Sequence, residues 1–174
     1  NRITSKTVDK DLPTSVSDLA FIGFGLSSAF TLIEFVNQLD YEFIHSQSKT
    51  FNSKLDILVF EQDPCLWGGI SYGPRSGFNS LLITPLDEFL PEYELAHFVS
   101  WMNDNVNWLL IPFKENLGIH SKTWLSTFEE ALAFGSTEKS HIPRYFFGLY
   151  LLDRLQLALA NTELDIDLRF INSE

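Results

Sequence analysis

Two glycines separated by one residue and followed by small residues can hold a phosphate group. These residues lie between an apolar run and a stretch with helical spacing, and they read Gly23, Phe24, Gly25, Leu26, Ser27 and Ser28. Gly23 allows a tight turn, Gly25 places no Cβ near a phosphate, and Ser28 is small at the third position of the GxGxxG pattern. Free N–H groups and the dipole at a helix start attract negative charge. We predict that Gly23, Gly25, Leu26, Ser27 and Ser28 bind the pyrophosphate of a dinucleotide.

An acidic residue follows the second apolar run, where a ribose would lie. Glu61 comes directly after Leu55–Phe60, and a carboxylate there accepts hydrogen bonds from ribose hydroxyls. Its distance from the glycines exceeds the usual ~20 residues, and the polar insertion Asp40–Ser53 accounts for the excess. An acid at this position favours FAD or NAD over NADP. The same letters also occur in ordinary strand-to-helix turns, so a turn without a ligand is the alternative interpretation.

The elements that must position these residues form a strand, helix, strand unit. Leu19–Ile22 is wholly apolar, as in a strand buried on both faces of a parallel sheet. Apolar residues recur at helical spacing from Leu26 to Leu39, and Leu55–Phe60 is a second strand. The crossover between the two strands is expected to be right-handed.

The remaining chain contains further elements of both kinds. We expect an ordered loop at Trp67–Pro91 with a short strand at Leu81–Ile83, a helix at Glu92–Trp108, a second helix from Pro143 to about Ala160 and a strand at Leu164–Phe170. The region Pro112–Thr137 supports no assignment.

Composition limits the classes of protein. The chain has 174 residues, 45% of them hydrophobic, and we expect one compact domain. A net charge of −11 argues against a nucleic-acid or anionic-membrane surface. Cys65 is the only cysteine, and the four histidines lack metal-ligand spacing, so we expect neither an intramolecular disulfide nor a metal site. No apolar run approaches ~20 residues and the polar opening lacks a signal-peptide core, so the cytoplasm is the expected compartment.

Four further segments carry a family resemblance. They are Pro64–Gly73, Phe78–Pro85, His97–Met102 and Ile142–Leu151. Together with the glycine pattern they resemble the FAD/NAD(P)-binding domain family that includes FAD-dependent urate hydroxylase, and more distantly the lysine and ornithine N-hydroxylases. The resemblance spans Leu19 to Phe170. It implies bound FAD, NADH or NADPH as reductant, and a monooxygenase or other oxidoreductase acting on a small organic substrate.

Individual residues near the expected site have two interpretations each. Gly68 and Gly69 could let the backbone pass close to the flavin and pyrophosphate, or could form a surface turn. Arg144 could hold a phosphate or a substrate carboxylate, or form a surface ion pair. Trp67 and Tyr72 could stack on a flavin, but packing is the commoner role of such residues. We assign no catalytic residue, because in a flavoenzyme the cofactor carries the difficult chemistry.

The expected fold is an α/β, Rossmann-like FAD/NAD(P)-binding domain of three layers. Its first two strands and its last strand are expected to lie side by side in a parallel sheet that the helices cover. We expect residues 1–17 to be a flexible polar arm and residues 18–174 to form the domain. The later strand with an Ala-Thr-Gly-type motif is missing, so we expect an N-terminal piece of a longer protein. The alternative function is a non-catalytic dinucleotide-binding module.

Overall fold

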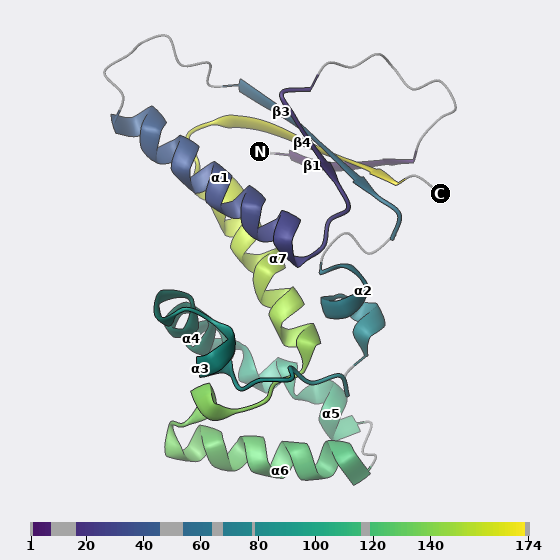
Figure 1. The fold of residues 1–174 in the computed structure, drawn as a ribbon, viewed down its shortest axis with the longest axis vertical. Helices are drawn as coiled ribbons and strands as arrows, with labels where there is room; N and C mark the ends of the chain where they lie inside the picture. The colour runs from purple at the N-terminus through teal and green to yellow at the C-terminus, as the bar shows by residue number, and fades with distance from the viewer. Residues whose placement is uncertain are drawn as a thin grey trace. The chain divides into compact units, whose positions relative to one another are not determined.

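The chain divides into two compact units. The computed structural model describes residues 2–7, 17–45, 54–63, 68–77, 79–115 and 119–172 (Figure 1). One unit, here called the sheet unit, comprises Asn1–Ile70 and Leu151–Glu174, and the other, the helical unit, comprises Ser71–Tyr150. The sequence predicts one compact unit over residues 18–174, whereas the contacts separate these two units. Residue periodicity shows which segments are helices or strands, but it does not show between which of them the long-range contacts form.

The sheet unit is built on four parallel strands. Their order across the sheet is β1-β4-β3-β2, and their bounds are β1 Arg2–Thr7, β2 Leu19–Ile22, β3 Lys54–Glu61 and β4 Asp165–Asn172. The prediction that the two early apolar runs and the final alternating run lie side by side is confirmed. In β4 the burial of the side chains follows the alternation of the sequence, because Ile166, Leu168 and Phe170 are buried while Asp165 is exposed.

The first strand corrects the expected polar arm. Arg2–Thr7 pairs along its length with β4, although we expected residues 1–17 to be a flexible arm. A polar segment becomes a strand here because a neighbouring strand edge supplies its backbone partners, which no local pattern reveals. Residues 8–16, the rest of that predicted arm, lie outside the described residues.

Helices cover one face of this sheet. Helix α1 (Leu26–His45) buries a stripe formed by Ala29, Leu32, Ile33 and Val36, and helix α7 (Arg144–Asn161) runs beside it from Leu151 onward (Figure 1). Arg154 of α7 lies 3.9 Å from the Glu34 carboxylate of α1. The predicted third layer, on the other face of the sheet, is not present among the described residues. Helix α1 also extends six residues into the predicted insertion, because contacts such as Gln38 to Glu42 continue its surface.

The helical unit contains mostly short and medium helices. Their bounds are α2 Gly69–Tyr72, α3 Leu86–Phe89, α4 Glu92–Leu109, α5 Ile111–Glu115 and α6 Ile119–Phe134, with 3₁₀ turns at Pro74–Ser76 and Thr137–Lys139. The helix predicted at Glu92–Trp108 is confirmed. The strand predicted at Leu81–Ile83 is reduced to a single bridge between Leu81 and Pro143. Among the described residues, no helix combines the length and apolar character needed to cross a membrane.

Aromatic packing forms the core of the helical unit around the start of α7. The ring of Tyr150 meets that of Phe98 edge-on at 4.9 Å, and its hydroxyl donates a hydrogen bond to the buried carboxylate of Glu94. Gly148 lies so close to the Tyr72 carbonyl that an added Cβ would approach this oxygen to 2.0 Å. The segment Ile142–Leu151, which carried part of the resemblance, is therefore tightly packed.

Candidate dinucleotide-binding site

The glycine segment links β2 to α1 in a turn that only glycine adopts easily. Gly23 has φ +81°, and its N–H donates to the Phe60 carbonyl at 2.7 Å. The next side chain, Phe24, is 1% exposed and packs edge-on against Phe170 of β4, with ring centres 5.3 Å apart. The packing of Phe24 against β4 thus holds the turn in place, while the backbone of the turn lies at the carboxyl edge of the sheet.

The start of α1 offers unpaired backbone donors. The Gly25 carbonyl accepts the first helical hydrogen bond, from the Ala29 N–H at 3.0 Å, so Gly25 is the N-cap residue. The next three N–H groups, of Leu26, Ser27 and Ser28, have no backbone partner among the described residues. The first turn also carries no acidic side chain. These donors and the helix dipole can receive an anionic group such as a diphosphate.

Gly25 provides the test of whether a dinucleotide fits. A Cβ built on Gly25 would have no atom of the described part of the chain within 4 Å, and the residue does not have the left-handed φ that favours glycine. Neither packing within the described residues nor backbone conformation therefore requires glycine at this position. The open space lies beside the unpaired N–H groups of α1. A closely approaching phosphate explains the glycine, so these residues fit the diphosphate of FAD or NAD.

A second glycine pair lies against the first. Gly68 and Gly69 have φ +74° and +56°, and a Cβ on Gly69 would lie 3.3 Å from the Cα of Gly25. The structure thus brings these predicted residues together with the glycine turn, although they are more than 40 positions apart in sequence. Cys65 and Trp67, which precede them, lie outside the described residues.

Glu61 joins the end of β3 to the glycine turn. Its side chain is buried, and its two carboxylate oxygens accept hydrogen bonds from the N–H of Phe24 and, at 2.8 Å, from the N–H of Asp63. Each carboxylate oxygen can accept more than one hydrogen bond, so acceptor capacity remains for ribose hydroxyls. The structure places Glu61 at the predicted position and adds a role that sequence reasoning missed, which is to hold the glycine turn.

Two further polar residues at this edge were also missed. The Asn172 side-chain amide donates to the carbonyls of Glu61 and Gln62, both at 3.2 Å, and Asp63 is 5% exposed. A signal was available, because Asn172 lies two residues after the alternating run Leu164–Phe170 and is the last residue of β4. The carboxyl ends of neighbouring parallel strands meet at one edge, so Asn172 and Glu61 could have been expected together.

Arg144 belongs to the helical unit, unlike the other predicted site residues. Its Nε donates to the Leu81 carbonyl at 3.1 Å, and its guanidinium lies 6.0 Å from the ring centre of Tyr72. Tyr72 in turn packs against Phe147 at 5.9 Å, in agreement with the packing interpretation of this residue. These contacts hold the loop before α3 to the start of α7. Binding of a cofactor phosphate by Arg144 stays a prediction.

Comparisons with known proteins show the family of the chain. The model of a family described as FAD-NAD(P)-binding matches residues 20–174. Uncharacterized proteins of Mycobacterium bovis and of two strains of Mycobacterium tuberculosis are 34% identical to this chain over 143 residues, which is 82% of the chain and 26% of each relative. The chain thus spans about a quarter of the length of these curated relatives. No solved structure matches it. The family match covers most of the chain, which therefore belongs to the FAD-NAD(P)-binding family.

Proposed function

We propose that this chain is the FAD-binding part of an NAD(P)H-dependent oxidoreductase of the monooxygenase type, acting on a small organic substrate. The observation that carries the proposal is the open space at Gly25 beside the unpaired N–H groups of α1. The family match supports binding of a flavin or nicotinamide dinucleotide. The resemblance to the group that includes FAD-dependent urate hydroxylase supports the choice of a monooxygenase.

Each part of the site has a distinct task in this proposal. The backbone at Gly23 and Gly25 and the N–H groups of Leu26, Ser27 and Ser28 bind the diphosphate. Gly68 and Gly69, the second of which lies against Gly25, permit close approach of the backbone to the cofactor. The bound flavin supplies the redox chemistry, with NADH or NADPH as its reductant. The protein contributes binding and orientation, and no described residue is assigned to acid-base catalysis.

Glu61 determines which dinucleotide the site accepts. Its carboxylate accepts hydrogen bonds from a free ribose, whereas a 2′-phosphate would bring a second negative charge against it. The carboxylate is buried and already held by two backbone N–H groups, so it cannot move away from a phosphate without releasing the turn. The site is therefore expected to favour FAD or NAD over NADP.

The first experiment measures the visible absorbance of the purified full chain after excess FAD is added and unbound FAD is removed. We expect a retained flavin spectrum. Gly25→Val places a branched side chain in the open space, and we expect at least a hundredfold loss of FAD affinity with an unchanged circular dichroism spectrum. Ala160→Val, at an exposed position of α7, adds the same side chain away from the site and is expected to retain FAD.

The outcomes separate the alternatives. Full FAD binding by Gly25→Val would overturn the site assignment, and a wild-type chain that never retains FAD would overturn FAD as the cofactor. A chain that retains FAD and oxidises NADH supports an oxidoreductase. Retained FAD without reduction by NADH or NADPH would contradict the proposed activity and favour the alternative, a non-catalytic dinucleotide-binding module.

A further inference from the structure

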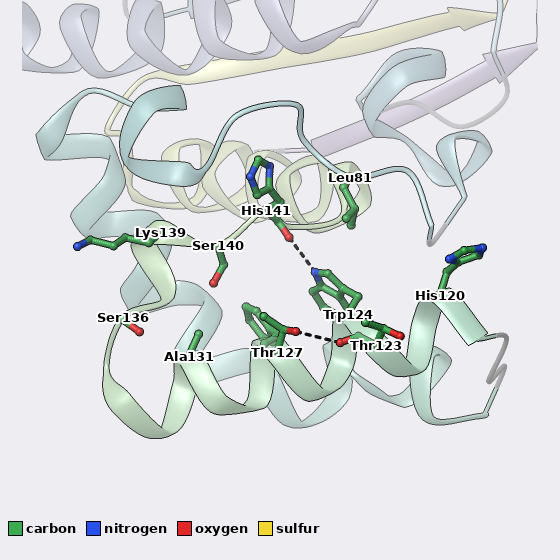
Figure 2. A pocket seen from close by; sticks show the side chains of 11 residues that line it. Leu81, His120, Thr123, Trp124, Thr127, Ala131, Ser136, Lys139, Ser140 and His141 are labelled. Atoms are coloured by element: carbon green, nitrogen blue, oxygen red, sulfur yellow. Dashed lines mark hydrogen bonds between the residues drawn. The ribbon is translucent and has the colours of Figure 1, made fainter.

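The helical unit contains a cavity that takes no residue from the sheet unit. It lies between α6 and the segment that follows it, has a volume of about 630 Å³, and is shown in Figure 2. Its lining consists of Leu81, six residues of α6 (His120, Thr123, Trp124, Thr127, Phe128 and Ala131) and four residues of the following segment (Ser136, Lys139, Ser140 and His141). This volume is in the range of sites for small organic ligands.

One wall of the cavity is a fixed aromatic surface. The Trp124 indole N–H donates to the His141 carbonyl at 2.8 Å, as the dashed line in Figure 2 shows. Its ring is stacked on Phe128, with centres 4.9 Å apart and an angle of 16°. It also contacts Phe113 at 4.7 Å. Because these contacts hold the indole in place, a planar ligand would meet a preorganised flat wall at little entropic cost.

Hydroxyl groups of α6 and of the segment that follows it line the cavity. The hydroxyl of Thr127 donates to the Thr123 carbonyl within α6 at 3.1 Å, so its remaining capacity is as an acceptor. Ser140 lies on the opposite wall and points toward α6 in Figure 2. Its hydroxyl can rotate to donate to an acceptor group of a ligand.

The charge of the lining is opposite in sign to that of the whole chain. The chain has 23 acidic and 12 basic residues, yet no carboxylate is among the lining residues. The titratable residues of the lining are Lys139, His120 and His141, of which the His141 imidazole points away from α6 in Figure 2 and donates from Nδ1 to the Leu82 carbonyl at 3.1 Å. Lys139 and His120 lie toward opposite ends of the row of lining residues in Figure 2. Lys139 is the formal cation among these lining residues, and a positive group beside the cavity favours the binding of an anionic ligand.

We propose that this cavity binds a small planar aromatic carboxylate. Its ring would pack on Trp124, and its carboxylate would lie near Ser140, with Lys139 swinging its flexible stem toward it. The proposal goes beyond the dinucleotide function, because none of the cavity residues belongs to the glycine site. It therefore holds or fails independently of FAD binding.

The experiment follows the indole N–H resonance of Trp124 in the ¹⁵N-labelled full chain, assigned by its loss in Trp124→Phe. The probes are benzoate and indole-3-carboxylate, with benzamide and benzylamine as uncharged and cationic controls. We expect a saturable shift at millimolar carboxylate, about tenfold weaker binding of the amide, and no binding of the amine. Equal binding of benzoate, benzamide and benzylamine, or no shift with any of them, would overturn the proposal.

Variants test whether the cavity itself is responsible. Ala131→Phe fills the cavity and is expected to abolish the shift, with dispersion of the other resonances reporting the fold. Lys139→Gln leaves the fold unaffected because it is an exposed residue, and is expected to weaken carboxylate binding about threefold to fivefold. Lys122→Gln, also exposed but absent from the lining, is the matched control and should bind as wild type. Unchanged affinity in both Ala131→Phe and Lys139→Gln would place the ligand elsewhere.

Discussion

Gly25 in the sheet unit and Gly148 in the helical unit differ in what would meet an added side chain. A Cβ on Gly25 would have no atom of the described residues within 4 Å, whereas a Cβ on Gly148 would approach the Tyr72 carbonyl to 2.0 Å. The protein's own packing therefore requires glycine at one position and leaves the other open. A glycine that packing and conformation do not require, beside unpaired donors, indicates a ligand.

The surrounding polar groups differ in the same way. Around Gly25, the N–H groups that begin α1 have no backbone partner among the described residues. Around Gly148, Arg144 donates to the Leu81 carbonyl and the Tyr150 hydroxyl donates to Glu94. In the glycine turn of the sheet unit, N–H donors remain for a ligand. In the segment around Gly148, the polar groups form hydrogen bonds within the helical unit.

The largest effect is expected from Gly148→Ala. The new methyl group would overlap the Tyr72 backbone, which cannot move away as a flexible side chain would. The overlap should cost about 3 kcal/mol or more of folding free energy, which exceeds the roughly 1 kcal/mol that alanine gains in helix propensity. Urea denaturation followed by circular dichroism measures the loss.

Gly25→Ser provides the opposite control for that comparison. Serine is a better N-cap residue than glycine by a few tenths of a kcal/mol, so the apo chain should be as stable as wild type or slightly more so. Its side chain enters the open space, so FAD affinity should fall. If Gly25→Ser unfolded the chain, or if Gly148→Ala were as stable as wild type, the contrast between the two glycines would be wrong.

A smaller effect is expected from Tyr150→Phe. The variant keeps the aromatic packing against Phe98 but removes the donor that serves the buried Glu94 carboxylate. Loss of a hydrogen bond to a buried charged group costs about 1 to 3 kcal/mol. The midpoint of urea denaturation measures this cost, and Tyr93→Phe, on a residue that is 65% exposed, should leave it unchanged. Equal stabilities of the two variants would show that the Glu94 contact contributes nothing.

Local patterns predicted those parts of the fold that depend on near neighbours. The alternating run at Leu164–Phe170 and the helix from Glu92 show strong periodicity, and each forms the predicted element. The apolar run Leu19–Ile22 also forms the predicted strand, but burial on both faces was wrong, because Ile22 is 90% exposed. Helix α6 was not predicted. Apolar residues of α6 are not confined to one face, because Phe128 is buried while Ile119 and Phe134 are over 80% exposed, and this weakens the helical period in its sequence. Strand β1 was missed because its partner lies more than 150 residues away.

For the candidate site too, the sequence identifies residues that follow a strand, but it does not reveal contacts between segments that are far apart in the chain. Gly23, Gly25 and Glu61 follow recognisable strands, so their residue types and positions are enough to propose them as site residues. The contact between Gly69 and Gly25 and the hydrogen bond from Phe24 to Glu61 depend on how distant segments return to the sheet edge. No spacing along the chain encodes those contacts, and they become visible only once the sheet order is known.

The smallest effect is expected from Arg144→Met, and it decides between two roles. The variant keeps an apolar stem but removes the hydrogen bond to the Leu81 carbonyl and the cation over the Tyr72 ring. Because Arg144 is half-buried, these contacts should together contribute about 1 kcal/mol to stability. Lys122→Met, an exposed cation of α6, should cost less than about 0.5 kcal/mol.

FAD affinity, measured on the same two variants, separates packing from cofactor binding at Arg144. If Arg144 also holds a cofactor phosphate, Arg144→Met should weaken FAD at least tenfold while Lys122→Met does not, since a charge-assisted contact is worth about 1.5 to 3 kcal/mol. Unchanged FAD affinity together with the expected loss of stability would assign Arg144 to the helical unit alone. The two units would then have separate roles, because every proposed cofactor contact would come from the sheet unit and Arg144 would only stabilise the helical unit.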